Sequence, residues 1–396
     1  MRVLFLPLAI PSHAFLMTPL AWAFRSAGHD VRVASQRRVL PAITQAGLPA
    51  VEVGGDSDFQ SEAVGFLRQR PQQLHHADGR GAPGAGPTEP WIRTAEACAA
   101  DLVALGEAWL PDLVVADSMV YAGPLLAEVL KVPFVRFSWG PDWPKTGLGM
   151  GGRHVDDHEP VRWPQRLLEL YRRYGARAEQ DTAAVTIDPF PAALQIPGLA
   201  GRLSVRPVPY NGSGTVPGWL AEPPRRPRIC VTWGTNTTVY MGDRGFLVPT
   251  ILDGLAGLNA EIVLALSQGD RDRLGELPAG ARVVSGLPLD QLLPTCSAMV
   301  SQGGAAGLIT AAVLGVPQIA VPMMADQPTN ARLLAESGAG IALQPDRLDA
   351  AAVRAAAQQL LTGSGPRAAA ERLSREIEQL PAPSAVVDRL TALARA

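Results

Sequence analysis

An apolar segment at the amino terminus, followed by a loop, a helical segment and a second apolar segment, limits the possible folds most strongly. We expect Val3–Leu8 to form a buried strand and residues 9–14 a loop. Phe15–Ala27 then forms a helix that ends at Gly28, and Val31–Ala34 forms the next strand. Wholly apolar strands joined by a helix are typical of parallel sheets covered on both faces. The chain therefore begins as an α/β fold.

The same pattern recurs in both halves of the chain. Further strands are expected at 113–116, 132–137, 228–232, 262–266, 281–285, 298–301 and 318–321. The segment between the halves, residues 207–227, has the Pro and Gly density of a linker. A single core rarely grows beyond roughly 250 to 300 residues, and this chain has 396.

We therefore predict two Rossmann-like α/β domains that face each other across a cleft, a frequent place for ligands. The first domain spans residues 1–206, the linker 207–227 and the second domain 228–375. A C-terminal helix over 376–396 is expected to pack back on the first domain.

Composition excludes several classes of function. The net charge of −2 gives no basic face for a nucleic acid. No apolar run reaches the ~20 residues of a membrane span. The three cysteines stand far apart, without the Cys or His spacing of a zinc site, and fit reduced thiols in the cytoplasm. We expect no metal, and the sequence contains no GxSxG or GxxxxGK[ST] motif of hydrolases or P-loop proteins.

A glycine-rich turn in the second half is the first candidate site. It follows the strand that ends at Met299-Val300 and opens a helix of small residues. A helix start offers free N–H groups and the positive end of the helix dipole, which suit a diphosphate. The residues concerned are Gln302, Gly303, Gly304, Ala305, Ala306 and Gly307. The alternative is a tight strand-to-helix turn without a ligand.

Two further polar segments follow strands of the second domain. Residues 232–238, which include Thr235, carry hydroxyls and amides that could face the same phosphates. Asp326-Gln327 follow the strand at 318–321 and could bind sugar hydroxyls, since open α/β sheets bind ligands at the carboxyl ends of their strands. An ordinary polar loop and an ordinary helix cap are the respective alternatives.

The first domain offers His13 in the loop after its first strand. Histidine side chains exchange protons near neutral pH, so a histidine here could act as a general base. Asp117 follows the strand at 113–116, and the same sheet edge could bring its carboxylate beside the imidazole. The alternative is a loop histidine without a role.

Three tryptophans lie in or next to two polar excursions of the first domain, at 56–90 and roughly 140–164. Trp91, Trp139 and Trp143 could line an apolar acceptor pocket or could simply pack.

Short segments in a fixed order carry a resemblance that spans nearly the whole chain. They are Arg2–Phe5, Pro11–His13, Gly28–Val31, Asp188–Pro191, Val208–Gly212, Gly303-Gly304, Gly315–Gln318, Asp326–Ala331 and Gly338–Gly340. Their order and spacing resemble the family 1 glycosyltransferases of the two-Rossmann (GT-B) type. The likeness is greatest to the actinobacterial enzymes that attach deoxysugars to polyketide antibiotics.

This resemblance implies an inverting, metal-independent transfer of a deoxysugar from a nucleotide diphosphate, dTDP, to an apolar aglycone. His13 would deprotonate the acceptor hydroxyl with the assistance of Asp117. By family likeness, Leu287-Pro288 would hold the nucleoside, the Gly304–Gly307 turn and Thr235 the diphosphate, and Asp326-Gln327 the sugar. No cofactor is implied beyond the nucleotide sugar, and the partners expected are the two small molecules, with a homodimer or an auxiliary activator protein left open.

Three departures from the family pattern keep an alternative open. The family reads His-Gly-Gly-x-Gly-Ser/Thr, whereas this chain has Gln302 for the histidine, Ala306 for the later glycine and Gly307 for the hydroxyl residue. Gln302 can donate a neutral hydrogen bond but no charge. A catalytically silent partner of another transferase is therefore the second hypothesis. A nucleotide-sugar epimerase would need a glycine fingerprint where Ala9-Ile10-Pro11 stands.

Overall fold

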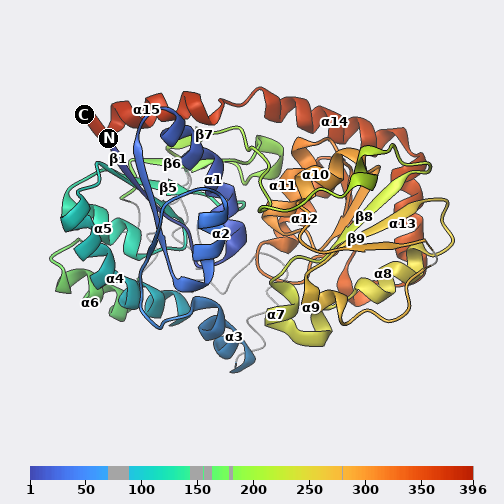
Figure 1. Ribbon diagram of the computed structural model, residues 1–396, viewed down its shortest axis with the longest axis horizontal. Helices are drawn as coiled ribbons and strands as arrows, with labels where there is room; N and C mark the ends of the chain where they lie inside the picture. The colour runs from blue at the N-terminus through green and yellow to red at the C-terminus, as the bar shows by residue number, and fades with distance from the viewer. Residues whose placement is uncertain (70–88, 143–154, 156–162, 178–181, 279, 396) are drawn as a thin grey trace. The chain divides into compact units, whose positions relative to one another are not determined.

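The computed structural model forms two compact α/β units (Figure 1). It describes residues 1–69, 89–142, 155, 163–177, 182–278 and 280–395. The described residues up to Pro207, together with those from Leu380 onward, form the first unit, and Val208–Gln379 lie in the second.

A seven-stranded parallel sheet is the centre of the first unit, in the order β3-β2-β1-β4-β5-β6-β7. Its strands are β1 Arg2–Leu6, β2 Asp30–Ser35, β3 Ala50–Glu52, β4 Leu113–Asp117, β5 Phe134–Phe137, β6 Val185–Asp188 and β7 Arg202–Ser204. Its α-helices are α1 Pro11–Ser26, α2 Leu40–Gln45, α3 Phe59–Gln69, α4 Glu89–Trp109, α5 Ala122–Leu130, α6 Gln165–Arg173 and α15 Pro383–Arg395. Because the chain runs outward in both directions from β1 and β4, their carboxyl ends form the switch point where open sheets bind ligands.

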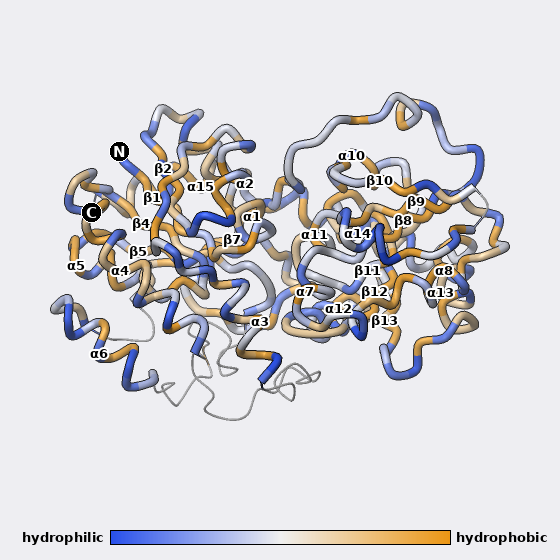
Figure 2. The backbone as a smooth tube through the Cα atoms, turned by 60° about the horizontal axis from the view of Figure 1, so that its bottom comes forward, coloured by the Kyte–Doolittle hydropathy of each residue, from blue (hydrophilic) through white to orange (hydrophobic). Residues whose placement is uncertain are grey.

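Both faces of this sheet are covered. On one face Leu4 and Leu6 pack with buried residues of α4 and α5, among them Leu102 and Leu125. On the other face α1 contacts β1, with Phe24 edge-to-face on Phe5, and α15 packs on α1. Figure 2 shows hydrophobic residues along the strands, as double-sided burial requires.

The first helix begins earlier than the sequence suggested. The expected loop at 9–14 is wrong in its second half, because Pro11 opens α1 and the His13 amide already donates to the Ile10 carbonyl at 3.0 Å. Proline suits the first helical position, since its missing N–H would lack an acceptor there, and it favours the extended backbone seen at Ile10. His13 therefore sits in the first turn of a helix at the carboxyl end of β1.

A six-stranded parallel sheet, ordered β10-β9-β8-β11-β12-β13, is the centre of the second unit. Its strands are β8 Arg228–Thr232, β9 Glu261–Ala265, β10 Arg282–Val284, β11 Ala298–Ser301, β12 Gln318–Ala320 and β13 Gly340–Ala342. Its α-helices are α7 Thr237–Met241, α8 Val248–Leu255, α9 Gln268–Arg271, α10 Leu289–Leu292, α11 Ala305–Val313, α12 Gln327–Glu336, α13 Ala350–Thr362 and α14 Ser364–Glu378. The switch point lies between β8 and β11.

The second unit is also packed on both faces. Ile229 and Val231 of β8 pack with buried residues of α8 and α13, whereas Cys230 packs with Met299 and with Ala311 of α11. The burial of both faces explains why its strands read as continuous apolar runs.

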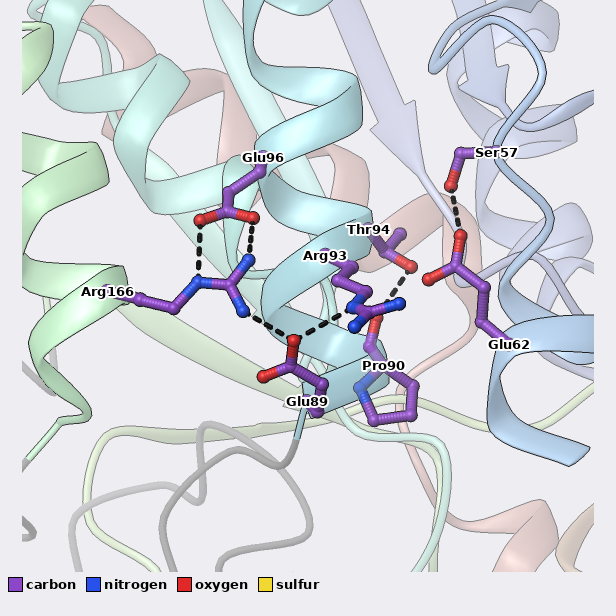
Figure 3. A network of polar contacts seen from close by, with 8 residues as sticks. All are labelled: Ser57, Glu62, Glu89, Pro90, Arg93, Thr94, Glu96 and Arg166. Atoms are coloured by element: carbon purple, nitrogen blue, oxygen red, sulfur yellow. Dashed lines mark hydrogen bonds and ion pairs between the residues drawn. The ribbon is translucent and has the colours of Figure 1, made fainter. Parts of the chain in front are cut away.

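A network of charged side chains joins α4 to α6 on the surface of the first unit (Figure 3). Arg166 of α6 binds Glu96 and Glu89 of α4, and Glu89 also binds Arg93 at 2.8 Å. These arginine contacts lower the pKa of Glu89. Exposed ion pairs of this kind contribute little each, so the network orients α6 on α4 rather than holding the core together. Among the described residues, no helix is both long and apolar enough to cross a membrane.

Candidate functional site

His13 and Asp117 meet at the switch point of the first unit. His13 Nδ1 lies 2.7 Å from Asp117 Oδ2, although 104 residues separate them in the chain. Asp117 is fully buried, and its other oxygen accepts the Met119 amide at 2.8 Å, which holds the carboxylate in place. The parallel pairing of β1 with β4 causes this meeting, because it places the segments that follow both strands at one sheet edge.

The pair is arranged for proton transfer. An Nδ1–H that donates to the carboxylate leaves Nε2 with a lone pair that can take a proton, and the carboxylate stabilises the resulting cation. His13 is 7% exposed, so solvent screens this interaction weakly. The arrangement is that of a general base and its orienting carboxylate.

Trp139 and Ser138 follow β5, the strand beside β4. The Trp139 indole stacks on the His13 imidazole, with ring centroids 4.9 Å apart and an interplanar angle of 30°. Ser138 is 3% exposed, and its hydroxyl has no hydrogen-bond partner in the part of the chain that the structure describes. The segment after β5 therefore brings an aromatic face and a buried hydroxyl to the edge occupied by His13 and Asp117.

A second buried carboxylate ends β6 in the same sheet. Asp188 pairs with Arg202 at 2.8 Å and accepts hydrogen bonds from the Phe190 amide and the Gln195 side chain. Burial raises the pKa of Asp188 to about 6, and Arg202 opposes that rise. Gln195 in turn accepts the Asp142 amide at 2.7 Å. This cluster ties the loop after β6 to the segment that follows Trp139.

In the second unit, the segments after β8 and β11 touch at the switch point. A Cβ built on Gly234 would lie 2.2 Å from Gln302 Nε2, so the glycine leaves room for the amide. Gln302 Oε1 is buried and accepts no hydrogen bond from the described residues. Thr235 is exposed directly after Gly234. The two loops thus place an amide side chain and an accessible hydroxyl residue at one edge.

The glycine turn opens α11 as expected, and its amides are partly occupied. Gly304 caps the helix, and the Ala305 amide donates to Asp326 Oδ2 at 3.1 Å. The amides of Ala306 and Gly307 remain free among the described residues, as the first amides of a helix do when no cap reaches them. These free amides and the positive end of α11 can receive an anion.

Asp326 and Gln327 make internal contacts. Besides the Ala305 amide, Asp326 Oδ2 accepts the Asn330 side chain at 2.6 Å. Gln327 Oε1 accepts the amides of Met323 and Met324, and its Nε2 donates to Thr237 at 3.2 Å. Both residues are 6% exposed. They therefore brace the loop after β12 against α11 and α7, in addition to any contact with a sugar.

The Leu287-Pro288 loop is held to α11 through Asn211. Asn211 Oδ1 accepts the Asp290 amide at 3.2 Å, and its Nδ2 lies 3.2 Å from Thr310 Oγ1 of α11. Gly214 lies against Gly286 and Pro288, since a Cβ there would overlap the Gly286 oxygen. Leu287 is 8% exposed in a core cluster, and Pro288 caps α10. The segment after Val208 therefore braces the expected nucleoside loop.

The structure brings most of the expected residues to two sheet edges, one in each unit. Trp91 instead packs edge-to-face on Phe59, at 5.3 Å, and against the core beneath α4. Trp143 lies outside the described residues. Sequence reasoning did not single out Asn211 or Ser138 as site residues, and it gave Trp139 no contact with His13. The position of Ser138-Trp139 immediately after an apolar strand was the available signal.

Comparisons with known proteins identify a family over most of the chain. The profile of the erythromycin biosynthesis protein CIII-like N-terminal domain matches residues 22–234, and that of the C-terminal domain matches residues 249–393. Tylactone mycaminosyltransferase of Streptomyces fradiae is 36% identical over 425 residues, which cover 100% of this chain and 93% of the relative. The 10-deoxymethynolide desosaminyltransferase of Streptomyces venezuelae is also 36% identical, with 100% and 97% covered.

Solved structures agree with the sequence relatives. Spinosyn forosaminyltransferase SpnP superimposes with a TM-score of 0.81 at 34% identity, and the likeness covers all of both chains. The glycosyltransferase VinC in complex with dTDP superimposes with a TM-score of 0.79 at 32% identity, again over all of both chains. The two parallel-sheet units are therefore the Rossmann-like domains of a GT-B fold.

Proposed function

The chain belongs to the erythromycin biosynthesis protein CIII-like family of glycosyltransferases, and we propose that it transfers a deoxysugar from dTDP to a polyketide aglycone in antibiotic biosynthesis. The bonded pair of His13 and Asp117 carries this proposal, because it supplies the base that an acceptor hydroxyl needs. Relatives named for transfer to tylactone and 10-deoxymethynolide, and solved neighbours with dTDP or thymidine diphosphate, support the substrate class.

We assign the donor to the second unit. The diphosphate oxygens would accept hydrogen bonds from the free amides of Ala306 and Gly307, at the positive end of the α11 dipole. Thr235 and the Gln302 amide would add neutral donors. The nucleoside would lie on Leu287-Pro288 and the sugar near Asp326-Gln327. Fixed donors around a leaving diphosphate stabilise the charge that develops as its bond to the sugar breaks.

We assign acceptor activation to the first unit. His13 Nε2 removes the proton of the acceptor hydroxyl while Asp117 holds Nδ1 and stabilises the imidazolium. The acceptor oxygen forms its bond to the anomeric carbon as the bond to the diphosphate breaks, and attack from the opposite side inverts that carbon. Trp139 would provide an apolar wall for the aglycone.

The transfer is expected to need no metal, because the amides and dipole of α11 compensate the diphosphate charge. Activity should therefore survive dialysis against EDTA and should not rise on addition of Mg²⁺ or Mn²⁺. Loss of activity in EDTA that Mg²⁺ restores would contradict this part of the proposal.

The experiment is a mass-spectrometric screen of the pure chain with dTDP-deoxysugars and the aglycones tylactone, 10-deoxymethynolide and aklavinone. A glycosylated aglycone is the expected product. His13→Ala should lower kcat by roughly 100-fold to 10,000-fold, the usual contribution of a general base, with dTDP binding unchanged. His29→Ala is the matched control, because His29 precedes β2 at the opposite edge of the same sheet. Unchanged kcat in His13→Ala would refute the assignment.

A silent partner protein was the alternative hypothesis, and the comparisons give it no support. It would be indicated by dTDP binding without product for any donor and acceptor pair.

We place the reaction in the cytoplasm because the three cysteines are free, and Cys98 and Cys230 are buried. Dependence on an activator protein would appear as product only after that protein is added, and a functional homodimer as specific activity that rises with chain concentration.

A further inference from the structure

The contact between Trp139 and His13 does more than line a pocket. The indole covers one face of the imidazole at a centroid distance of 4.9 Å and an angle of 30°. Asp117 holds the same ring in its own plane through Nδ1 at 2.7 Å. One contact resists tilting of the ring and the other resists its rotation, so the two together define a single orientation for Nε2.

Nε2 is the His13 ring nitrogen that remains available for reaction. Nδ1 is engaged by Asp117, and Nε2 has no hydrogen-bond partner among the described residues. The His13 side chain is 9% exposed, so few water molecules can solvate the ring when it becomes charged. Neighbouring protein groups must then stabilise the imidazolium.

We propose that Trp139 is a positioning residue for the reaction: its indole face holds the His13 imidazole and stabilises its protonated form during transfer. This inference rests on the proposed function, in which Nε2 takes the acceptor proton. The acceptor O–H bond breaks, its electron pair forms the bond to the anomeric carbon, and the diphosphate leaves with the pair of the broken bond. Charge appears on the imidazole only as this happens, and the electron-rich indole face attracts a cation more than a neutral ring.

A purely apolar wall for the aglycone makes a different kinetic prediction. A wall contacts the acceptor equally in the ground state and in the transition state, so its loss raises the acceptor KM and leaves kcat unchanged. Support of the imidazolium exists mainly in the transition state, so its loss lowers kcat. The split between kcat and KM therefore distinguishes the two roles.

The test compares Trp139→Leu, which keeps an apolar side chain, with Trp139→Phe, which keeps an aromatic face. Single-turnover rates are measured with the donor and acceptor pair found in the product screen. We expect Trp139→Leu to lower the rate roughly threefold to thirtyfold with the acceptor KM within twofold, and Trp139→Phe to recover most of it. Thermal melting of both variants identifies any loss of folding, and Trp139→Met, which is also apolar and lacks an aromatic face, replaces Trp139→Leu if that variant does not fold.

A double-mutant cycle with His13→Ala separates this inference from the proposed function. If Trp139 acts through His13, Trp139→Leu should cause no further loss of rate in the His13→Ala background. Losses that multiply, or a rise in acceptor KM alone, would overturn the role of Trp139 and leave the base intact. Full rate in His13→Ala alone would instead overturn the proposed function, and this inference with it.

A spectroscopic readout needs no substrate. In protein labelled with ¹³C at histidine Cε1, the His13 signal is assigned by its loss in His13→Ala, since the chain has six histidines. The indole ring current should shift the His13 Hε1 resonance, and Trp139→Leu should abolish that shift. An unchanged His13 resonance in Trp139→Leu would show that the rings do not stack in solution and would refute the proposal.

Discussion

Replacing Gly234 by alanine tests how the donor site holds its diphosphate. A Cβ at this position would lie 2.2 Å from Gln302 Nε2 and 3.2 Å from its Cδ, whereas unbonded heavy atoms prefer roughly 3.5 to 4.0 Å. The Gln302 amide must therefore move by about 1 Å or more. The backbone adds a smaller cost of about 1 kcal/mol, because Gly234 has a φ of +67°, which L side chains rarely adopt.

The expected effect on donor binding follows from the contact that is displaced. A hydrogen bond from a neutral amide to a charged phosphate contributes about 1.5 to 3 kcal/mol. Its loss should weaken dTDP binding by about tenfold to 100-fold, since each 1.4 kcal/mol is a factor of ten. Calorimetric titration with dTDP measures this constant directly. The acceptor KM, which depends on the other unit, should change by less than about twofold.

Two comparisons identify Gln302 as the cause. In a Gln302→Ala background the new methyl group meets no amide, so Gly234→Ala should leave dTDP affinity within about twofold of that background. Gly257→Ala is the matched control, because Gly257 has a φ of +75° in the same unit and a Cβ there meets nothing within 4 Å. Equal weakening in both backgrounds, or unchanged affinity in Gly234→Ala alone, would refute the placement of Gln302 at the diphosphate.

Two further substitutions test the surroundings of the sites. Asn211→Ala removes hydrogen bonds to the Asp290 amide and to Thr310, each worth about 1 kcal/mol. The donor KM should therefore rise severalfold while the acceptor KM stays constant. An unchanged donor KM would show that these contacts do not brace the nucleoside loop. Burial raises the pKa of Asp188 from 3.8 to about 6, so the native state binds this proton more tightly than the unfolded chain, and the stability it contributes is present below about pH 4 and lost as pH rises through 6. Between pH 4 and 7 the parent should therefore lose up to about 3 kcal/mol of its free energy of unfolding relative to Asp188→Asn, measured by urea unfolding at each pH. If the difference in free energy of unfolding between the two proteins did not change with pH, Arg202 would keep Asp188 charged and the prediction would be wrong.

The residues at the carboxyl ends of the strands could be predicted from the sequence, because the pattern that identifies a strand involves only a few consecutive residues. The short apolar run Val114–Ala116 is fully buried, as expected for an interior strand of a parallel sheet that is covered on both faces. The polar residue that follows such a run must then lie at the carboxyl edge. This reasoning placed His13, Asp117 and the turn at Gln302 among the candidate residues before any contact was known.

The start of the first helix shows where local reasoning failed. Pro11 belongs to the loop expected at residues 9–14, but it opens α1. Proline ends a helix in its interior and suits its first position, and the sequence does not say which position it occupies. Pro19 lies inside the same helix without ending it.

The amino-acid sequence by itself determined which side chains follow the ends of the strands, because an apolar run and the polar residue after it are properties of a few consecutive residues. Only the tertiary structure decided which of those side chains meet. The contact of His13 with Asp117 spans 104 residues and exists because β1 pairs with β4, and Trp139 reaches the same imidazole because β5 lies next in the sheet. Strand order results from the packing of helices on both faces of the complete sheet, and no local pattern contains that information.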